Sequence, residues 1–407
     1  IPVPDLLMLS LNKQGKTTTF EIRDYELKKK GVKKVEYTDE AYLKQRRLLN
    51  PKVFKEANKV YLQGFYEGTE MTTVKGYIQV AIDGSKGEIP NTPKNREFFG
   101  FSSNQTDTIR AKALFSSVYD VQNHFFLDIE VDKYTANETE VAKKNIEQAL
   151  KIVDNNKLLV TFDRGYPSLE FFNWLNNRDI KFLMRVKSTH YTKEKREMIT
   201  NDEFVRLIHN KHRTHKIKNT YPEYHQEFVK QKETIVRFTK IKLNSDSEEH
   251  LVSNLSLEEF DHQELKELYG NRWNIETSYN TIKNKLKIES FTGNLPQFIF
   301  QDIYAQTVVY NQIQDMIYHA NEKLKEKNST KNLKHKYQVN ENKAIGLFKE
   351  RFIKIMLMAS NKDYEIEYDQ LIEDMTNYAS IIRKNRGTNP RKWSVANKYK
   401  PNMKASF

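Results

Sequence analysis

Two stretches decide the fold: residues 77–83, Tyr-Ile-Gln-Val-Ala-Ile-Asp, and residues 157–163, Lys-Leu-Leu-Val-Thr-Phe-Asp. In each, apolar residues alternate along a short run that ends at an aspartate, which is the pattern of a core β-strand. If the two strands are parallel neighbours, Asp83 and Asp163 lie at the same edge of a sheet, where ligand sites of open α/β sheets are found. For either aspartate alone, a simple turn cap is the alternative, since Asp-Gly is a common turn pair.

The segments around these strands predict an α/β protein. Their order is strand, strand, strand, helix, strand, helix, strand, which gives a mixed sheet flanked by helices. This order resembles the ribonuclease H-like fold. The further elements expected are strands at 113–121 and 125–131, a helix opened by a Thr135-x-x-Glu138 capping box, a helix at 168–177 and a strand at 181–186.

Changes in composition and hydrophobic periodicity along the chain predict four segments. Residues 1–72 read as a helical N-terminal DNA-binding region rich in Lys and Arg, for which a solvated helical face is the alternative. Because the chain opens at Ile1 without a methionine, we expect this region to be truncated. The other segments are a catalytic core at 73–187 and 251–300, a β-rich insertion at 188–250 with strands at 233–243 and 250–255, and a helical C-terminal region with a basic tail at 301–407.

Composition narrows the class of protein. The chain has 67 Lys and Arg against 54 Asp and Glu, a net charge of +13, which favours an anionic partner such as nucleic acid. Cysteine is absent, so disulfides, thiolate metal sites and a cysteine nucleophile are excluded. No apolar run approaches the roughly 18 residues that span a bilayer, so we expect no membrane partner. These features predict a soluble, intracellular, basic protein.

A third carboxylate lies in residues 269–276, Tyr-Gly-Asn-Arg-Trp-Asn-Ile-Glu, within a stretch expected to be helical from Asp261 to Lys287. At about 100° per residue, four polar side chains of this stretch fall within about 60° of one another on a helix. We therefore expect one edge of the helix to pack on the core and the next to display the polar group. An amphipathic helix with ordinary charge spacing is the alternative. The four residues are Tyr269, Arg272, Glu276 and Lys283.

Three carboxylates without a soft ligand predict a site for a hard cation. Mg²⁺ and Mn²⁺ prefer oxygen ligands, and two such ions about 4 Å apart can clamp the attacking and leaving oxygens of a phosphoryl displacement. We expect two ions, held by Asp83, Asp163 and Glu276. Arg272 and Lys283 are then placed to hold phosphates.

The motif Tyr-x2-Arg-x3-Glu-x6-Lys, carried by Tyr269, Arg272, Glu276 and Lys283, resembles the signature of bacterial DDE transposases of the IS-four type. The resemblance extends to 82–85 (Ile-Asp-Gly-Ser) and 162–166 (Phe-Asp-Arg-Gly-Tyr), and covers about residues 73–300.

The resemblance implies a cut-and-paste transposase that cleaves double-stranded DNA at the inverted-repeat ends of an element and joins them to target DNA. In the family, the Tyr, Arg and Lys of the signature contact phosphates near the end of the element, and members act as dimers on paired ends. A homodimeric complex in the bacterial cytoplasm, associated with the nucleoid, is therefore implied. Two other functions stay open: a metal-dependent nuclease of the same fold, which cuts without joining, and a catalytically inactive DNA-binding remnant.

Two features near the site stay open in the sequence. Arg164 is either a phosphate ligand or a partner for its neighbour Asp163. The insertion at 188–250 lacks the tryptophan that, in relatives, stacks on a flipped base during hairpin formation. Tyr221 or Tyr224 is the aromatic residue that could replace it.

Overall fold

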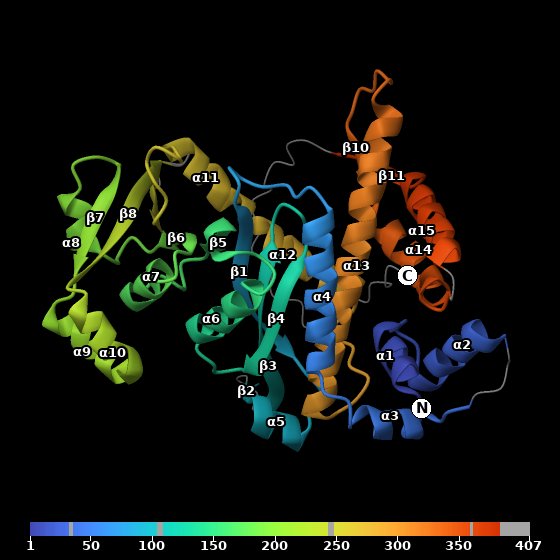
Figure 1. Ribbon diagram of the computed structural model, residues 1–407. Coiled ribbons are helices and arrows are strands. Elements are labelled where there is room, and N and C mark those ends of the chain that lie inside the picture. Colours follow the sequence, from blue (N-terminus) through green and yellow to red (C-terminus); the bar gives the residue numbers. More distant parts are fainter. Residues whose placement is uncertain (32–35, 104–108, 243–247, 359–360, 383–407) are drawn as a thin grey trace. The chain divides into compact units, whose positions relative to one another are not determined.

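The computed structural model describes residues 1–31, 36–103, 109–242, 248–358 and 361–382 (Figure 1). The chain divides into two compact units. One combines Ile1–Lys55 with Asn280–Phe407, and the other is Glu56–Tyr279. The second unit, called the sheet unit below, contains all three carboxylates predicted to hold metal; the first is called the helical unit. The four segments proposed from the sequence stay a prediction.

The described residues of the sheet unit form a nine-stranded mixed sheet. Its central strands run in the order β4-β3-β1-β5-β6, with β3 antiparallel to β1 and β4, and with β5 parallel to both β1 and β6. This is the ribonuclease H-like arrangement, so the predicted fold class is confirmed. The strands are β1 (Ile78–Glu88), β2 (Phe101–Ser103), β3 (Ile109–Asp120), β4 (Phe126–Lys133), β5 (Leu158–Phe162) and β6 (Lys181–Val186), followed by β7 (Asp202–Ile208), β8 (Glu233–Lys242) and β9 (Glu248–Ser253).

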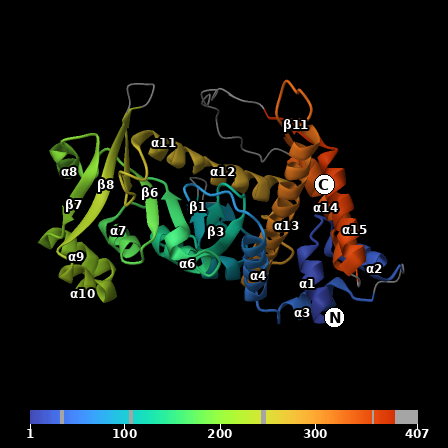
Figure 2. The ribbon, with the colours of Figure 1, turned by 45° about the horizontal axis from the view of Figure 1, so that its top comes forward.

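Helices cover both faces of this sheet (Figure 2). The Ser116 hydroxyl of β3 donates to Asn145 of α6 (2.7 Å), whereas the Ser117 hydroxyl donates to the Tyr279 oxygen of α12 (2.7 Å). Because successive strand residues point to opposite faces, α6 and α12 lie on opposite sides of the sheet. The helices of the sheet unit are α4 (Lys52–Gly68, entering from the helical unit), α5 (Pro93–Phe99), α6 (Glu138–Ala149), a 3₁₀ turn (Asn155–Lys157), α7 (Leu169–Asn176), α11 (His262–Asn271) and α12 (Trp273–Asn280).

The start of α6 differs from the predicted capping box. Asn137, not Thr135, is the N-cap, and its side chain accepts a hydrogen bond from the Thr139 amide (3.0 Å). An Asx cap only two residues before the bonded amide satisfies the helix end locally. Glu138 is consequently the first helical residue, and its carboxylate is not tied to an N-cap backbone.

The predicted insertion continues the main sheet. Strand β9 is antiparallel to β6 of the core and to β8, and β8 in turn pairs with β7. The two strands expected from the sequence are present as β8 and β9. Strand β7 and three helices were not expected: α8 (Thr192–Glu197), α9 (Lys211–Thr220) and α10 (Pro222–Lys230).

The helical unit confirms the expected helical content at both ends of the chain. It also holds a two-stranded sheet that the sequence did not predict, formed by β10 and β11. Part of the basic stretch after Lys30 and the tail from Arg383 lie outside the described residues. Its elements are α1 (Val3–Leu11), α2 (Thr18–Lys30), α3 (Asp39–Arg46), a π-helical turn (Thr281–Lys285), α13 (Pro296–Asn328), β10 (Tyr337–Val339), α14 (Glu341–Met356), α15 (Asn361–Thr376) and β11 (Ala379–Ile381).

An ion pair lies in the core of the helical unit. Arg46 Nη2 donates to Asp302 Oδ1 (2.5 Å), and both residues are buried. Asp302 also accepts from the Thr292 amide (2.7 Å), and Lys13 Nζ lies 3.9 Å from its second oxygen. Among the described helices of the chain, none is both long and apolar enough to cross a membrane.

Candidate active site

Asp83 and Asp163 follow the last paired residues of two parallel strands. The β1–β5 ladder ends at Ile82 opposite Phe162, so the two aspartates are the next residues on adjacent strands. Strand alternation places Asp83 on the same face as Gln79, whose side chain donates to the Leu268 carbonyl of α11 (2.7 Å). The prediction that these strands are parallel neighbours is therefore confirmed, and Asp83 faces the α11–α12 side.

The expectation that Asp83 terminates its strand is wrong. Strand β1 continues to Glu88 because its antiparallel ladder with β3 runs on, pairing Asp83 with Ser117 and Glu88 with Lys112. Only the β5 side of the pairing stops at Ile82. Asp83 thus sits in a rigid strand whose β5 side has just become open.

Glu276 is carried by α12, which is fastened to the backbone of Asp83. Tyr279, three residues further along this helix, donates its hydroxyl to the Asp83 carbonyl (2.7 Å) and accepts from Ser117 (2.7 Å). This phenol couples the turn that carries Glu276 to the strand that carries Asp83. The third carboxylate is thereby brought to the edge occupied by the two aspartates.

Arg272 lies buried among these carboxylates. Its Nη2 donates to Glu276 Oε1 (3.2 Å), and the residue is only 6% exposed. Burial raises the pKa of Asp83 to about 6; the Arg272 charge opposes this rise, while the charges of Asp163 and Glu276 add to it. All four groups are therefore close enough to act on one another.

The donor set fits a hard divalent cation. Within the described residues, no three His, Asp or Glu side chains are arranged to ligate one metal ion. The three carboxylates nevertheless converge from separate elements, with one buried arginine to offset them, and like charges at close range disfavour ionisation. A divalent cation with oxygen ligands is the kind of group that relieves this repulsion.

The signature residues do not share one exposed helical face. The helix is interrupted at Arg272, which separates α11 from α12, and the π-helical turn at Thr281–Lys285 changes its periodicity. Tyr269 is buried in an apolar cluster with Leu265 and Leu268. Lys283 belongs to the helical unit, where its Nζ lies 3.7 Å from Glu289.

The loop after β5 leaves Arg164 exposed. The Gly165 amide donates to Asp163 Oδ1 (2.7 Å), whereas Arg164 forms no ion pair among the described residues. Of the two readings left open for Arg164, the partner of Asp163 is not the one seen in the structure. Trp273, beside Arg272, is a large exposed aromatic that the sequence reasoning did not single out.

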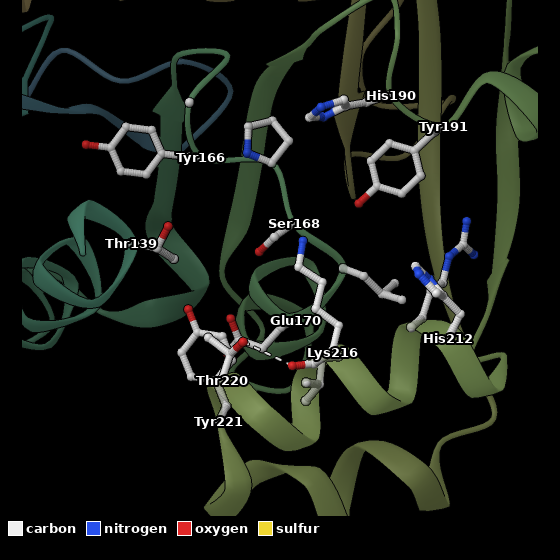
Figure 3. Close-up of a pocket in the computed structure, with 15 residues that line it drawn as sticks. Thr139, Tyr166, Ser168, Glu170, His190, Tyr191, His212, Lys216, Thr220 and Tyr221 are labelled. Atoms are coloured by element: carbon white, nitrogen blue, oxygen red, sulfur yellow. Dashed lines mark hydrogen bonds between the residues drawn. The ribbon is translucent and has the colours of Figure 1, made fainter.

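A cavity of about 470 Å³ lies beside this loop (Figure 3). It is lined by Gly165 and Tyr166 of the loop and by residues of the insertion helix α9, among them His212 and Lys216. Tyr221 lines the cavity, and Lys143 Nζ lies 4.7 Å from its ring centroid. Tyr224 instead bonds Asn173 and does not line this cavity.

Comparisons with known proteins identify the family of this chain. A family described as "Transposase DDE domain" matches residues 75–312, more than half of the chain. The chain is also similar to the transposase InsG for insertion sequence element IS4 of Escherichia coli (strain K12), with 23% identity over 260 residues, 61% of this chain and 54% of the relative. It therefore spans about half the length of that relative.

Among solved structures, the chain is similar to the piggyBac transposase in a cryo-EM structure of its synaptic complex with hairpin DNA. The TM-score is 0.42 at 11% identity, over 95% of this chain and 76% of the other. The family match includes Asp83, Asp163 and Glu276. With these three carboxylates brought to one edge of a ribonuclease H-like sheet, the chain belongs to the family of DDE-domain transposases.

Proposed function

We propose that this chain is a transposase that cleaves double-stranded DNA at the ends of a transposable element and transfers those ends to target DNA. One observation carries the proposal: Asp83 and Asp163 follow adjacent parallel strands, and the helix of Glu276 is bonded to the Asp83 backbone through Tyr279. This arrangement supports a catalytic role for all three carboxylates better than a role in turns or helix solvation.

Asp83, Asp163 and Glu276 are the residues that would hold Mg²⁺ or Mn²⁺, with two ions expected. Such ions, when bound, activate the attacking oxygen and offset charge at the leaving oxygen of a phosphodiester. The protein side of the reaction is positioning. Strand β1 and Tyr279 fix Asp83 and Glu276 relative to each other, and Arg272 holds the Glu276 carboxylate in place.

Phosphate contacts are proposed for Arg164, Tyr269, Arg272 and Lys283. Arg164 is the best supported, because it is exposed and lies directly beside Asp163. Arg272 is buried against Glu276, and Tyr269 is buried beside Arg272, so a phosphate contact by either residue would require it to become accessible when DNA binds. A homodimer on paired DNA ends, in the bacterial cytoplasm and near the nucleoid, completes the proposal, and the net charge of +13 supports the DNA partner.

The test is a cleavage and strand-transfer assay with the full chain on DNA that carries the element's own ends. Mg²⁺ is compared with EDTA, and the parent with Glu276→Gln. Glu267→Gln, on the exposed surface of α11, is the matched control. Metal-dependent cutting with joined products, lost in Glu276→Gln and kept in Glu267→Gln, supports the transposase. Cutting without joining favours the nuclease, and DNA binding without any chemistry favours the inactive remnant.

A further inference from the structure

A fourth carboxylate approaches the catalytic edge from the α6 side of the sheet. Glu138, the first residue of α6, places its Oε2 3.2 Å from the position that a Cβ on Gly84 would occupy. Gly84 directly follows Asp83 in β1 and points to the opposite face. Gly84 has no side chain, so the Glu138 carboxylate can approach the β1 backbone directly. That backbone lies between Glu138 and the Asp83 side chain, which points to the other face.

Tyr166 approaches the same place from the loop after β5. Its ring packs on Phe162 (5.1 Å between centroids), and the residue is only 2% exposed. Among the described residues, its buried hydroxyl has no hydrogen-bond partner. A buried hydroxyl without a partner costs free energy, so its position calls for a ligand or a functional group.

The charges of Glu138 and Asp83 both affect the pKa of Tyr166. Burial, followed by the charges of Asp83 and Glu138, raises the pKa of Tyr166 well above its usual range. Both carboxylates therefore lie within electrostatic range of the Tyr166 hydroxyl, which stays protonated and available as a donor.

The ordinary surface role of Glu138 does not account for this placement. Its nearest cation is Lys86, with Nζ 3.7 Å from Oε1 and both side chains more than 40% exposed. A long, exposed ion pair of this kind contributes little to stability. Nor does Glu138 close a capping box, since Asn137 caps α6 alone.

We propose that Glu138 is a fourth carboxylate of the divalent-cation site, and that Tyr166 is a positioning residue whose hydroxyl donates to one of that site's carboxylates once the cation is bound. The inference rests on the proposed function. The proposed cation site would then include residues from both faces of the sheet: the three carboxylates on the α12 side, and Glu138 and Tyr166 on the α6 side. A side chain at Gly84 would meet the Glu138 carboxylate at 3.2 Å and Leu114 at 3.3 Å, so these neighbours would have to shift by a few tenths of an ångström.

The test measures Mn²⁺ binding to the full chain without DNA, from the electron paramagnetic resonance signal of free Mn²⁺. Glu138→Gln is compared with Glu140→Gln, a control on the same turn of α6 with the same 42% exposure but paired with Lys143. We expect Glu138→Gln to weaken Mn²⁺ binding about 10- to 100-fold, the range seen for supporting residues of metal sites. Glu140→Gln should bind as the parent does. Equal affinities of the two variants overturn the inference.

Tyr166→Phe separates positioning from packing. Removing an unpartnered buried hydroxyl leaves the thermal unfolding midpoint unchanged or higher, while Mn²⁺ binding weakens about 10-fold. A lower unfolding midpoint with unchanged Mn²⁺ affinity would show that Tyr166 has a structural role, and would overturn its proposed role in positioning a carboxylate of the cation site. Asp83→Asn distinguishes failure of this inference from failure of the proposed active site. If it alone loses Mn²⁺, only this inference fails; if it binds as the parent does, the proposed active site fails as well.

Discussion

Two aspartates, the buried Asp302 of the helical unit and the half-buried Asp83 of the sheet unit, have opposite electrostatic surroundings. In the helical unit, Asp302 is surrounded by donors: the Arg46 guanidinium, the Thr292 amide and the nearby Lys13 ammonium. Although burial raises the pKa of Asp302, these cations and donors outweigh it and leave the pKa lowered. In the sheet unit, Asp83 has one nearby cation and two further carboxylates, and its pKa is raised to about 6.

The difference separates a structural carboxylate, Asp302, from one that we propose to be catalytic, Asp83. The protein supplies its own compensation for Asp302, so that residue needs nothing from outside the chain. For Asp83, compensation is incomplete, and a cation bound at the proposed site would supply the missing positive charge. The same distinction applies to the buried Tyr166, whose hydroxyl has no partner among the described residues.

The largest effect is expected on catalysis. Asp163→Asn should lower the rate of DNA cleavage by about 1000-fold, or about 4 kcal/mol in activation free energy, because it removes a charge required in the transition state. Asp302→Asn should leave the rate per folded molecule unchanged. Single-turnover cleavage, normalised to folded protein by circular dichroism, checks both. Equal losses in the two variants would contradict the division into structural and catalytic aspartates.

Asp302→Asn should instead have a large effect on the free energy of unfolding. Asp302→Asn leaves the Arg46 charge buried without its partner, and we expect the free energy of unfolding to fall by about 3–5 kcal/mol. Urea denaturation measures this loss. The double variant Asp302→Asn with Arg46→Met should recover part of it, since the orphaned charge is removed. A double variant less stable than the single one would show that the pair acts through packing alone.

Asp83→Asn should stabilise the chain when no divalent ion is present. An unfolded aspartate titrates near 3.9, whereas Asp83 titrates at about 6 in the fold, so stability is lost as pH rises between these values. Removing the charge should restore about 1–3 kcal/mol at pH 7. Thermal unfolding in EDTA measures the gain. Added Mg²⁺ should raise the midpoint of the parent but not that of Asp83→Asn.

Lys349 gives the smallest effect, a pH dependence in the helical unit. Burial, and then the charge of Lys13, lower the pKa of Lys349 to about 7 from 10.5. Between these values the unfolded chain binds more protons than the folded one, so stability should rise with pH by up to about 1.4 kcal/mol per unit. Urea midpoints from pH 7 to 9 measure the slope, which Lys349→Met should flatten. An unchanged slope would assign the dependence to other groups.

The part of the fold that depends on alternation could be predicted from the sequence. The stripes that end at Asp83 and Asp163 identified two parallel core strands, and each carboxylate lies at the predicted edge. The end of β1 could not be predicted, because Asp-Gly reads locally as a turn while pairing with β3 keeps the strand extended. Tertiary pairing outweighed the local signal.

The spacing of the signature identified Glu276 but not the geometry around it. A constant 100° per residue does not allow for the break at Arg272 or the π-helical turn that follows α12. Glu138 and Tyr166 escaped notice for another reason. Glu138 was read as half of a capping box, and its contact with Gly84 spans 54 positions of the chain. No local pattern encodes such a contact.

Because β9 pairs with β6 of the core, the insertion cannot be deleted without exposing an edge of the main sheet. A shortened chain without β7 to β9 would present the N–H and C=O groups of β6 as an open edge, a template for pairing with other chains. Such a deletion is expected to cause self-association, whatever it does to DNA. Changes of length are better tolerated in α9, which lies between β7 and β8 and lines the cavity, because there they would reshape the cavity without opening the sheet.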